Sequence, residues 1–154
     1  IVRCNADCPL IDSDIIDLII NAYLDNIGKY DYVSNILEPS FPIGMHTEVF
    51  SYDSLESANT NAKNILEREH VTPYIYNNPQ KFNLKNISMK EDLSHYRLTL
   101  DQIEDYELIK KIYENLYDTN KNFSMIDIIN LIKEKESWLQ LNRHIEKNSI
   151  ISNI

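Results

Sequence analysis

Positive charge and glycine are both scarce in this sequence. It carries 15 lysine and arginine residues against 24 aspartate and glutamate residues, for a net charge of −9, and its longest basic cluster is the pair Lys110-Lys111. We do not expect such a chain to bind nucleic acid or an anionic membrane, although it can bind a polyphosphate through a bridging metal ion. Only two glycines occur in 154 residues, and none of the glycine-rich nucleotide-binding motifs is present.

Long apolar runs are absent as well, and cysteine is rare. No stretch reaches the roughly 18 apolar residues that a membrane-spanning helix needs. Cys4 and Cys8 lie four residues apart with no histidine nearby, a spacing that suits neither a zinc site nor a disulfide across a strand end. We expect two free, largely buried thiols and a reducing, cytoplasmic location.

The remaining composition is that of one soluble α/β domain. Hydrophobic residues make up 43% and charged residues 25% of the chain, and its length suffices to bury a core. Apolar patterns predict strands over residues 1–4, 30–35, 46–51, 81–88 and 96–101, and helices over 13–27, 54–66, 106–117 and 125–135. Strands that alternate with helices indicate an α/β sheet. We place the domain at residues 1–142 and a tail at residues 143–154.

Two aspartates stand at corresponding places in this pattern. Asp7 follows the first predicted strand and Asp101 ends the last, each directly before a helix-forming segment. Open α/β sheets bind ligands at such positions, and Mg²⁺ takes one or two carboxylates together with phosphate oxygens and water. The alternative is that both aspartates are helix-capping residues. Asp105 is either a partner of this site or a residue of the first helical turn.

Further polar residues are candidates for substrate contacts, each with a structural alternative. Glu48 shares a strand face with His46 and is able to reach a polar substrate, although a lone strand glutamate is more often solvated. His70 is either an acid–base group or a structural hydrogen-bonding group, and the sequence favours the structural role. No serine–histidine–aspartate ordering and no metal-binding histidine pair stands out in the sequence.

Several segments, taken in order, are more specific than their single residues. They read Ala-Asp-Cys-Pro-Leu-Ile (6–11), Tyr-Val-Ser-Asn (32–35), Phe-Pro-Ile-Gly (41–44) followed by Glu-Val-Phe (48–50), Arg-Glu-His-Val-Thr-Pro (68–73) and Arg-Leu-Thr-Leu-Asp-Gln-Ile-Glu-Asp (97–105). Together they resemble the cytidylyltransferase family that includes the spore coat polysaccharide biosynthesis proteins. That family is related to the synthetases of CMP-activated sugar acids. The resemblance runs from residue 1 to about residue 141.

This resemblance implies a Rossmann-like nucleotide-diphospho-sugar transferase fold and a nucleotidyltransferase activity. Members transfer CMP from CTP to a sugar for surface polysaccharide and release pyrophosphate. Asp7 and Asp101 match the two metal-binding aspartates of the family, which implies Mg²⁺ as the cofactor. Asn35, Glu48 and His70 fall where relatives shape the sugar side of the pocket.

The resemblance also has implications for assembly and completeness. Residues 68–76 resemble a segment that relatives use in dimer contacts, which implies a homodimer. Relatives carry an amino-terminal loop of small and basic residues that binds the CTP triphosphate, and no segment of this sequence matches it. We therefore expect the carboxyl-terminal part of such an enzyme, with an incomplete fold and no activity by itself. The alternatives are a non-enzymatic assembly or dimerisation module, and a glycosyltransferase of related fold with a metal-binding aspartate pair.

Overall fold

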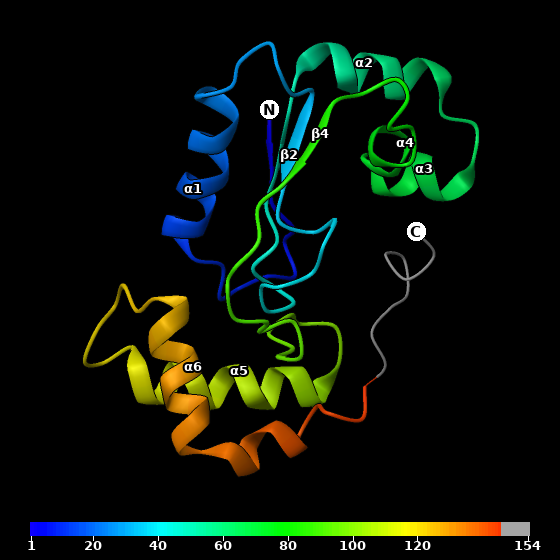
Figure 1. Cartoon of the computed structure of the whole chain (residues 1–154). Coiled ribbons are helices and arrows are strands. Elements are labelled where there is room, and N and C mark those ends of the chain that lie inside the picture. The colour runs from blue at the N-terminus through cyan, green and yellow to red at the C-terminus, as the bar shows by residue number, and fades with distance from the viewer. Residues whose placement is uncertain (146–154) are drawn as a thin grey trace.

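The computed structural model describes residues 1–145 and shows a small β-sheet with helices around it (Figure 1). The strands are β1 (Val2–Arg3), β2 (Tyr32–Ser34), β3 (Glu48–Phe50) and β4 (Leu84–Asn86). The helices are α1 (Ser13–Leu24), α2 (Tyr52–Asn61), α3 (Ile65–His70), α4 (Pro73–Tyr76), α5 (Ile103–Leu116), α6 (Met125–Glu134) and the 3-10 helix η1 (Glu136–Gln140). The predicted α/β class is confirmed. Among these helices, none is long and apolar enough to cross a membrane.

The sheet is mixed, with the strand order β1-β3-β2-β4. β3 is antiparallel to both β1 and β2, and β4 is parallel to β2. β1, β2 and β4 therefore run in one direction and end at the same edge of the sheet. Since open sheets of this kind bind ligands beyond the carboxyl ends of their parallel strands, this edge is the place to look for a site.

Successive residues of β2 face opposite layers of the molecule, as the two-residue period of a strand requires. Tyr32 packs in a cluster with residues of α2 and α4, whereas Val33 packs with Val49 and with Ile19 of α1. All three strand residues of β2 are buried. The sheet is thus covered by α1 on one face and by α2–α4 on the other (Figure 1).

A third apolar cluster lies beyond the sheet edge, where α5 and α6 pack together (Figure 1). It joins the inner faces of these helices to two irregular segments, around residues 41–45 and 93–98. Its fully buried members are Met45, Leu98, Leu108, Ile112, Ile128 and Ile132. The irregular segments are therefore anchored by buried side chains although they form no sheet.

The predicted strand over residues 96–101 is wrong. Only one isolated parallel bridge forms there, between Ile43 and Arg97. The amide of Ile43 donates to the carbonyl oxygen of Tyr96 at 2.9 Å, and the amide of Leu98 donates to that of Ile43 at 2.8 Å. The facing segment cannot extend this ladder, because it contains Pro42, which has no amide hydrogen, and Gly44, whose φ is +101°.

Two smaller predictions also need correction. The helix predicted over residues 54–66 is two helices, because Ala62 takes an extended conformation and ends α2, and Asn64 caps α3 with its side chain. Cys8 is buried as predicted, but Cys4 is exposed, since it lies past the short strand β1; both thiols are free. The predicted tail, residues 143–154, lies mostly outside the described residues.

Candidate functional site

A cavity of about 480 Å³ lies at the edge of the sheet where β1 and β2 end. Its walls come from the segment after β1, the loop between β2 and β3, the junction of α3 and α4, and residues 94–101. The side chains that carry its chemistry are Arg3, Asp7, Cys8, His46, Glu48, His70, Tyr76, Arg97 and Asp101. Four of the five residues predicted for the site therefore line one cavity, namely Asp7, Glu48, His70 and Asp101.

The fifth predicted residue, Asn35, does not line the cavity. Its side chain is fully buried. The amide nitrogen donates to the carbonyl oxygen of Met45 at 2.8 Å, and the amide oxygen accepts from the backbone of Thr47 at 2.9 Å. Asn35 therefore fixes the loop that leads into β3, next to the cavity wall at His46 and Glu48.

The segments that carry Asp7 and Asp101 are joined by two hydrogen bonds. The hydroxyl of Thr99 and the amide of Leu100 both donate to the carbonyl oxygen of Asp7, at 3.1 and 2.8 Å. Because Asp101 follows Leu100 directly, these bonds hold its backbone beside that of Asp7. The two aspartates thus line one cavity, although the second does not end a strand.

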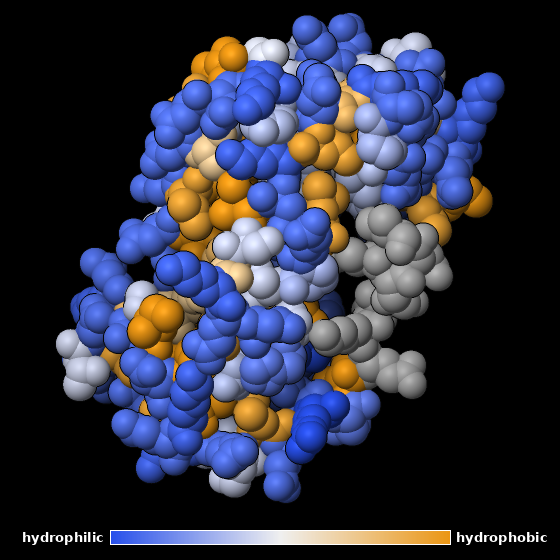
Figure 2. Space-filling model, in the orientation of Figure 1, coloured by the Kyte–Doolittle hydropathy of each residue, from blue (hydrophilic) through white to orange (hydrophobic). Residues whose placement is uncertain are grey.

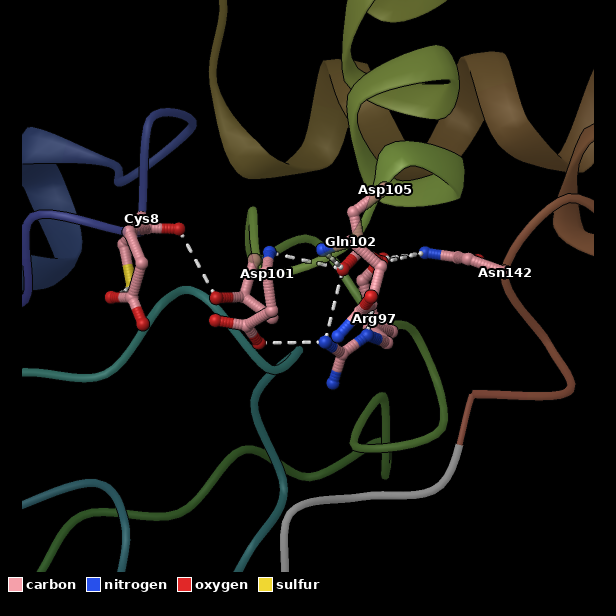
Figure 3. A network of polar contacts seen from close by, with 8 residues as sticks. Cys8, Arg97, Asp101, Gln102, Asp105 and Asn142 are labelled. Atoms are coloured by element: carbon pink, nitrogen blue, oxygen red, sulfur yellow. Dashed lines mark hydrogen bonds and ion pairs between the residues drawn. The ribbon is translucent and has the colours of Figure 1, made fainter.

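The Asp101 carboxylate belongs to a network centred on Arg97 (Figure 3). Arg97 donates to Asp101 Oδ2 from Nη2 at 2.6 Å, and it contacts Asp105 through Nε and Nη2 at 2.9 and 3.0 Å. The side chains of Arg97 and Asp105 are 8% and 0% exposed, whereas that of Asp101 is 28% exposed. Asp101 is therefore the most exposed member of this network.

Asp105 is held by groups on several segments. Asn142 donates to Asp105 Oδ1 at 2.9 Å, and the backbone amides of Asp101 and Gln102 donate to Oδ2 at 3.1 Å each. Burial disfavours the ionised carboxylate, but the hydrogen bonds from Arg97, Asn142 and the two amides outweigh it and lower the pKa of Asp105. Asp105 is thus a residue of the first helical turn of α5, where it completes the capping box, and it shares Arg97 with Asp101.

The pKa of the Arg97 guanidinium is also shifted. Its burial disfavours the protonated form, but hydrogen bonds and charge from Asp105 and then Asp101 raise the pKa of the guanidinium above its usual value. Arg97 therefore remains a cation at any physiological pH. With Arg97 positive and Asp101 and Asp105 negative, the network has a net formal charge of −1.

Glu48 forms a second charged group in the cavity wall. It is 4% exposed, accepts from Arg3 at 2.5 Å through Oε1, and accepts from the hydroxyl of Tyr32 at 3.1 Å through Oε2. Burial and the nearby Glu48 charge raise the pKa of Tyr76 to about 12. Tyr76 therefore lines the cavity as a neutral phenol, which can donate or accept a hydrogen bond.

Two groups beside Asp7 are held in their neutral forms. Burial lowers the pKa of His46 despite the opposing influence of Asp7. Burial, together with the Asp7 charge and a hydrogen bond of 3.4 Å to Asp7 Oδ1, raises the pKa of Cys8 to about 12. Cys8 is thus a thiol that donates to Asp7, not a reactive thiolate.

The donor set of the cavity fits a hard divalent cation that shares its ligands with a substrate. Among residues 1–145, no group of three or more histidine, cysteine or acidic side chains could hold a metal ion. Asp7 and Asp101 supply two carboxylates in one cavity. Mg²⁺ is suited to such a site, because it binds through one or two carboxylates and completes its shell with phosphate oxygens and water.

Sequence reasoning missed the roles of Arg97 and Asn142. Arg97 stands four residues before Asp101 and eight before Asp105. This spacing indicates a shared contact only once the start of α5 is known to lie between the two aspartates. Asn142 had no local signal, because its contacts are to residues 97 and 105, far away in sequence. It also lies at the end of the predicted domain.

Comparisons with known proteins agree with this geometry. A family model described as cytidylyltransferase matches residues 1–133. The chain is 36% identical over 158 residues to an uncharacterized protein of Methanocaldococcus jannaschii, covering 100% of this chain and 56% of that protein. It is 33% identical over 117 residues to the spore coat polysaccharide biosynthesis protein SpsF of Bacillus subtilis, covering 74% of this chain and 47% of SpsF. The chain therefore spans about half the length of these curated relatives.

One solved structure is also similar. It is a cytidylyltransferase from Leptospira borgpetersenii, with a TM-score of 0.86 and 38% sequence identity, and the match covers 95% of this chain and 60% of that one. The match shows a nucleotide-diphospho-sugar transferase fold. The resemblance read from the sequence motifs is confirmed.

Proposed function

The chain belongs to the cytidylyltransferase family, and from this premise we propose that it is part of an enzyme that transfers CMP from CTP to a sugar. SpsF is by its name a spore coat polysaccharide biosynthesis protein, which supports a CMP-sugar for surface polysaccharide as the product. Because the chain spans about half of its curated relatives, we assign this activity to a protein of their full length.

In the proposed reaction, a sugar hydroxyl attacks the α-phosphorus of CTP. A new oxygen–phosphorus bond forms, the bond to the oxygen bridging the α- and β-phosphates breaks, and pyrophosphate leaves while the hydroxyl proton passes to solvent. Asp7 and Asp101 would hold Mg²⁺, which stabilises the charge that develops on the phosphate oxygens. The contacts of Thr99 and Leu100 to Asp7 keep both carboxylates in the same cavity.

The sugar is assigned to the part of the cavity lined by Glu48, His70 and Tyr76. Glu48 is kept in place by Arg3 and Tyr32, so it is a fixed acceptor for sugar hydroxyls. His70 lies at the end of α3, next to Val71, whose φ of 71° turns the chain toward α4. Asn35 acts indirectly, by holding the loop before β3.

The observation that carries this proposal is that Asp7 and Asp101 line one cavity in a chain of this family. The test is pyrophosphate release from CTP by the full-length protein, with Mg²⁺ and a panel of sugars. Asp7→Asn and Asp101→Asn should each lower the rate roughly a hundredfold. Asp118→Asn, on the exposed segment after α5, is the matched control and should leave the rate unchanged.

Other outcomes would identify the alternatives. Release of a free nucleoside diphosphate in place of pyrophosphate would indicate a glycosyltransferase. Calorimetry that finds no Mg²⁺-dependent binding of CTP would favour an assembly module whose carboxylates are structural.

We further propose that the enzyme is a cytoplasmic homodimer. The exposed free thiol of Cys4 is consistent with a reducing compartment. Ile65, Leu66 and Val71 are 80%, 52% and 37% exposed, and Figure 2 shows apolar side chains at the outer edge of the molecule near α3. Ile65 and Leu66 lie just before the segment 68–76 and Val71 lies within it, so the three offer an apolar surface to a second copy.

A further inference from the structure

The two longest helices of the carboxyl-terminal half begin in the same way. α5 and α6 each have an aspartate at the third helical position whose carboxylate accepts hydrogen bonds from the residue that caps the helix. Asp105 accepts from the amide of Gln102 at 3.1 Å, and Asp127 accepts from the amide of Ser124 at 2.8 Å. Both carboxylates therefore satisfy free amide groups at a helix amino terminus.

Only one of these two carboxylates also contacts a cation within the described residues. Asp105 is fully buried and forms an ion pair with Arg97, whereas Asp127 is half-buried and its hydrogen bonds are to Ser124 alone. Capping does not require the arginine, as Asp127 demonstrates. The pairing of Asp105 with Arg97 thus needs a reason other than the start of the helix.

The geometry of Arg97 suggests that reason. Nη2 donates to Asp101 at 2.6 Å and to Asp105 at 3.0 Å, and Nε donates to Asp105 at 2.9 Å. Two of these three bonds go to Asp105, so its carboxylate fixes the plane of the guanidinium. The side-chain amide of Asn142 donates to Asp105 Oδ1 at 2.9 Å and to the backbone carbonyl oxygen of Arg97 at 3.0 Å. It therefore ties the Asp105 carboxylate to the Arg97 backbone.

The charges of Arg97, Asp101 and Asp105 point to the same role for Asp105. Arg97 forms ion pairs with both carboxylates, so the three groups together carry one net negative charge, and Asp101 is the more exposed of the two carboxylates that share the guanidinium. Without the Asp105 charge, the buried guanidinium would have Asp101 as its only carboxylate partner among residues 1–145. A carboxylate that neutralises a buried arginine is a poorer ligand for a second cation.

We propose that Asp105 is a positioning residue for the Asp101 carboxylate: by sharing and orienting Arg97, it keeps Asp101 in the cavity as a carboxylate that Arg97 neutralises only in part and that can bind a divalent cation. This inference rests on the proposed function, because it takes Asp7 and Asp101 as the cation ligands. Asn142 supports Asp105 from the segment that follows η1.

The test is the affinity of the protein for Mn²⁺ alone, measured from the water-proton relaxation of the bound ion. Asp105→Asn retains the shape and one oxygen acceptor for the helix cap, but it removes the charge shared with Arg97 and places an NH2 group where Oδ1 accepts from Arg97 and Asn142. We expect Mn²⁺ affinity to fall about tenfold. Asp127→Asn removes the equivalent capping charge at α6 and should leave Mn²⁺ affinity unchanged.

A double variant separates charge compensation from damage to the fold. Arg97→Gln combined with Asp105→Asn removes both members of the buried pair, so that no unpaired charge is left in the interior. We expect this variant to bind Mn²⁺ more tightly than Asp105→Asn alone and close to the wild type. It also provides the test if the single variant does not fold.

The possible results of these Mn²⁺ titrations distinguish a failure of the proposed cation site from a failure of the role proposed for Asp105. If the wild-type protein binds Mn²⁺ neither alone nor in the presence of CTP, both the cation site and this inference are wrong. If the wild-type protein binds and Asp105→Asn binds equally well, only the inference is wrong. Equal losses in Asp105→Asn and Asp127→Asn, or a double variant weaker than the single one, would likewise show that Asp105 acts only through the fold.

Discussion

The hydroxyl of Thr99 donates a hydrogen bond of 3.1 Å to the backbone carbonyl oxygen of Asp7. The amide of Leu100 donates to the same oxygen at 2.8 Å. One oxygen atom therefore joins two segments that each carry one of the candidate ligand aspartates. No sheet pairing connects these two described segments, so these two bonds contribute directly to holding the Asp7 backbone beside that of Asp101.

Replacement of Thr99 should therefore affect both stability and the site. Thr99→Val keeps the shape and removes the hydroxyl donor, so we expect a loss of about 1 kcal/mol in the free energy of unfolding. Mn²⁺ affinity should fall as well, because Asp7 is then held by a single donor. The measurements are urea unfolding and Mn²⁺ titration.

A matched control is available at Thr119, whose hydroxyl donates to Leu116 at 3.0 Å on the exposed end of α5. Thr119→Val should change unfolding by less than about 0.5 kcal/mol and leave Mn²⁺ affinity unchanged. Equal effects of the two substitutions would contradict a special role for the Thr99 contact.

The cavity wall contains a position that only glycine can occupy. Gly44 has a φ of +101°, and a Cβ atom there would lie 2.6 Å from the carbonyl oxygen of Leu98. Gly44→Ala should therefore destabilise the fold by roughly 3 kcal/mol or more, because backbone atoms cannot move aside as a flexible side chain can. Urea unfolding monitored by circular dichroism measures the effect.

Gly28 provides the comparison for this substitution. Its φ is +81°, but a Cβ atom there would have no neighbour within 4 Å. Gly28→Ala should thus show only the conformational cost of a left-handed alanine, about 1 kcal/mol. If Gly44→Ala were no worse than Gly28→Ala, the close approach to Leu98 would not be a constraint on the fold.

Acid should weaken the fold partly through Asp105. Burial opposes its ionisation, but the contacts of Arg97 and Asn142 lower its pKa below the ordinary value of 3.8. A carboxylate with a lowered folded-state pKa contributes stability that is complete above the unfolded-state pKa and is lost as pH falls through the folded-state pKa. The wild type should lose this contribution between about pH 4 and more acidic values.

Urea unfolding across the acidic range tests this directly. Asp105→Asn should be less stable than the wild type near neutral pH, and the difference should narrow as the pH falls below about 4. Parallel stability curves for the two proteins would contradict the assignment of this acid sensitivity to Asp105.

Local patterns in the sequence predicted the elements whose stability is itself local. Ser124 begins α6 as predicted, because its hydroxyl accepts from the amide of Asp127. The three strands β2, β3 and β4 lie inside their predicted ranges, where apolar and β-branched residues cluster. Such signals act within a few residues and can be read from a single sequence.

Contacts between distant segments could not be read in this way. Residues 96–101 alternate apolar and polar side chains, but the sequence does not say whether a partner strand accompanies them. Asn35 was predicted to bind substrate, yet its position is defined by Met45 and Thr47. The motifs identified the polar residues of the region, and only the fold shows which of them reach the cavity.

The proposed homodimer leads to a prediction about α3. Ile65 and Leu66 are exposed apolar residues at the start of this helix, and their burial against a second copy would provide apolar contact area. Ile65→Glu should therefore shift the protein from dimer to monomer in light scattering at micromolar concentration, without a change in circular dichroism.

The matched control is Ile126→Glu, because Ile126 is 52% exposed on α6. A monomeric wild-type protein would exclude the dimer. A dimer that Ile126→Glu dissociates and Ile65→Glu leaves intact would place the contact on α6 and not on α3. Because Ile65 lies close in sequence to His70 in the cavity wall, loss of the dimer is also expected to weaken sugar binding more than cation binding.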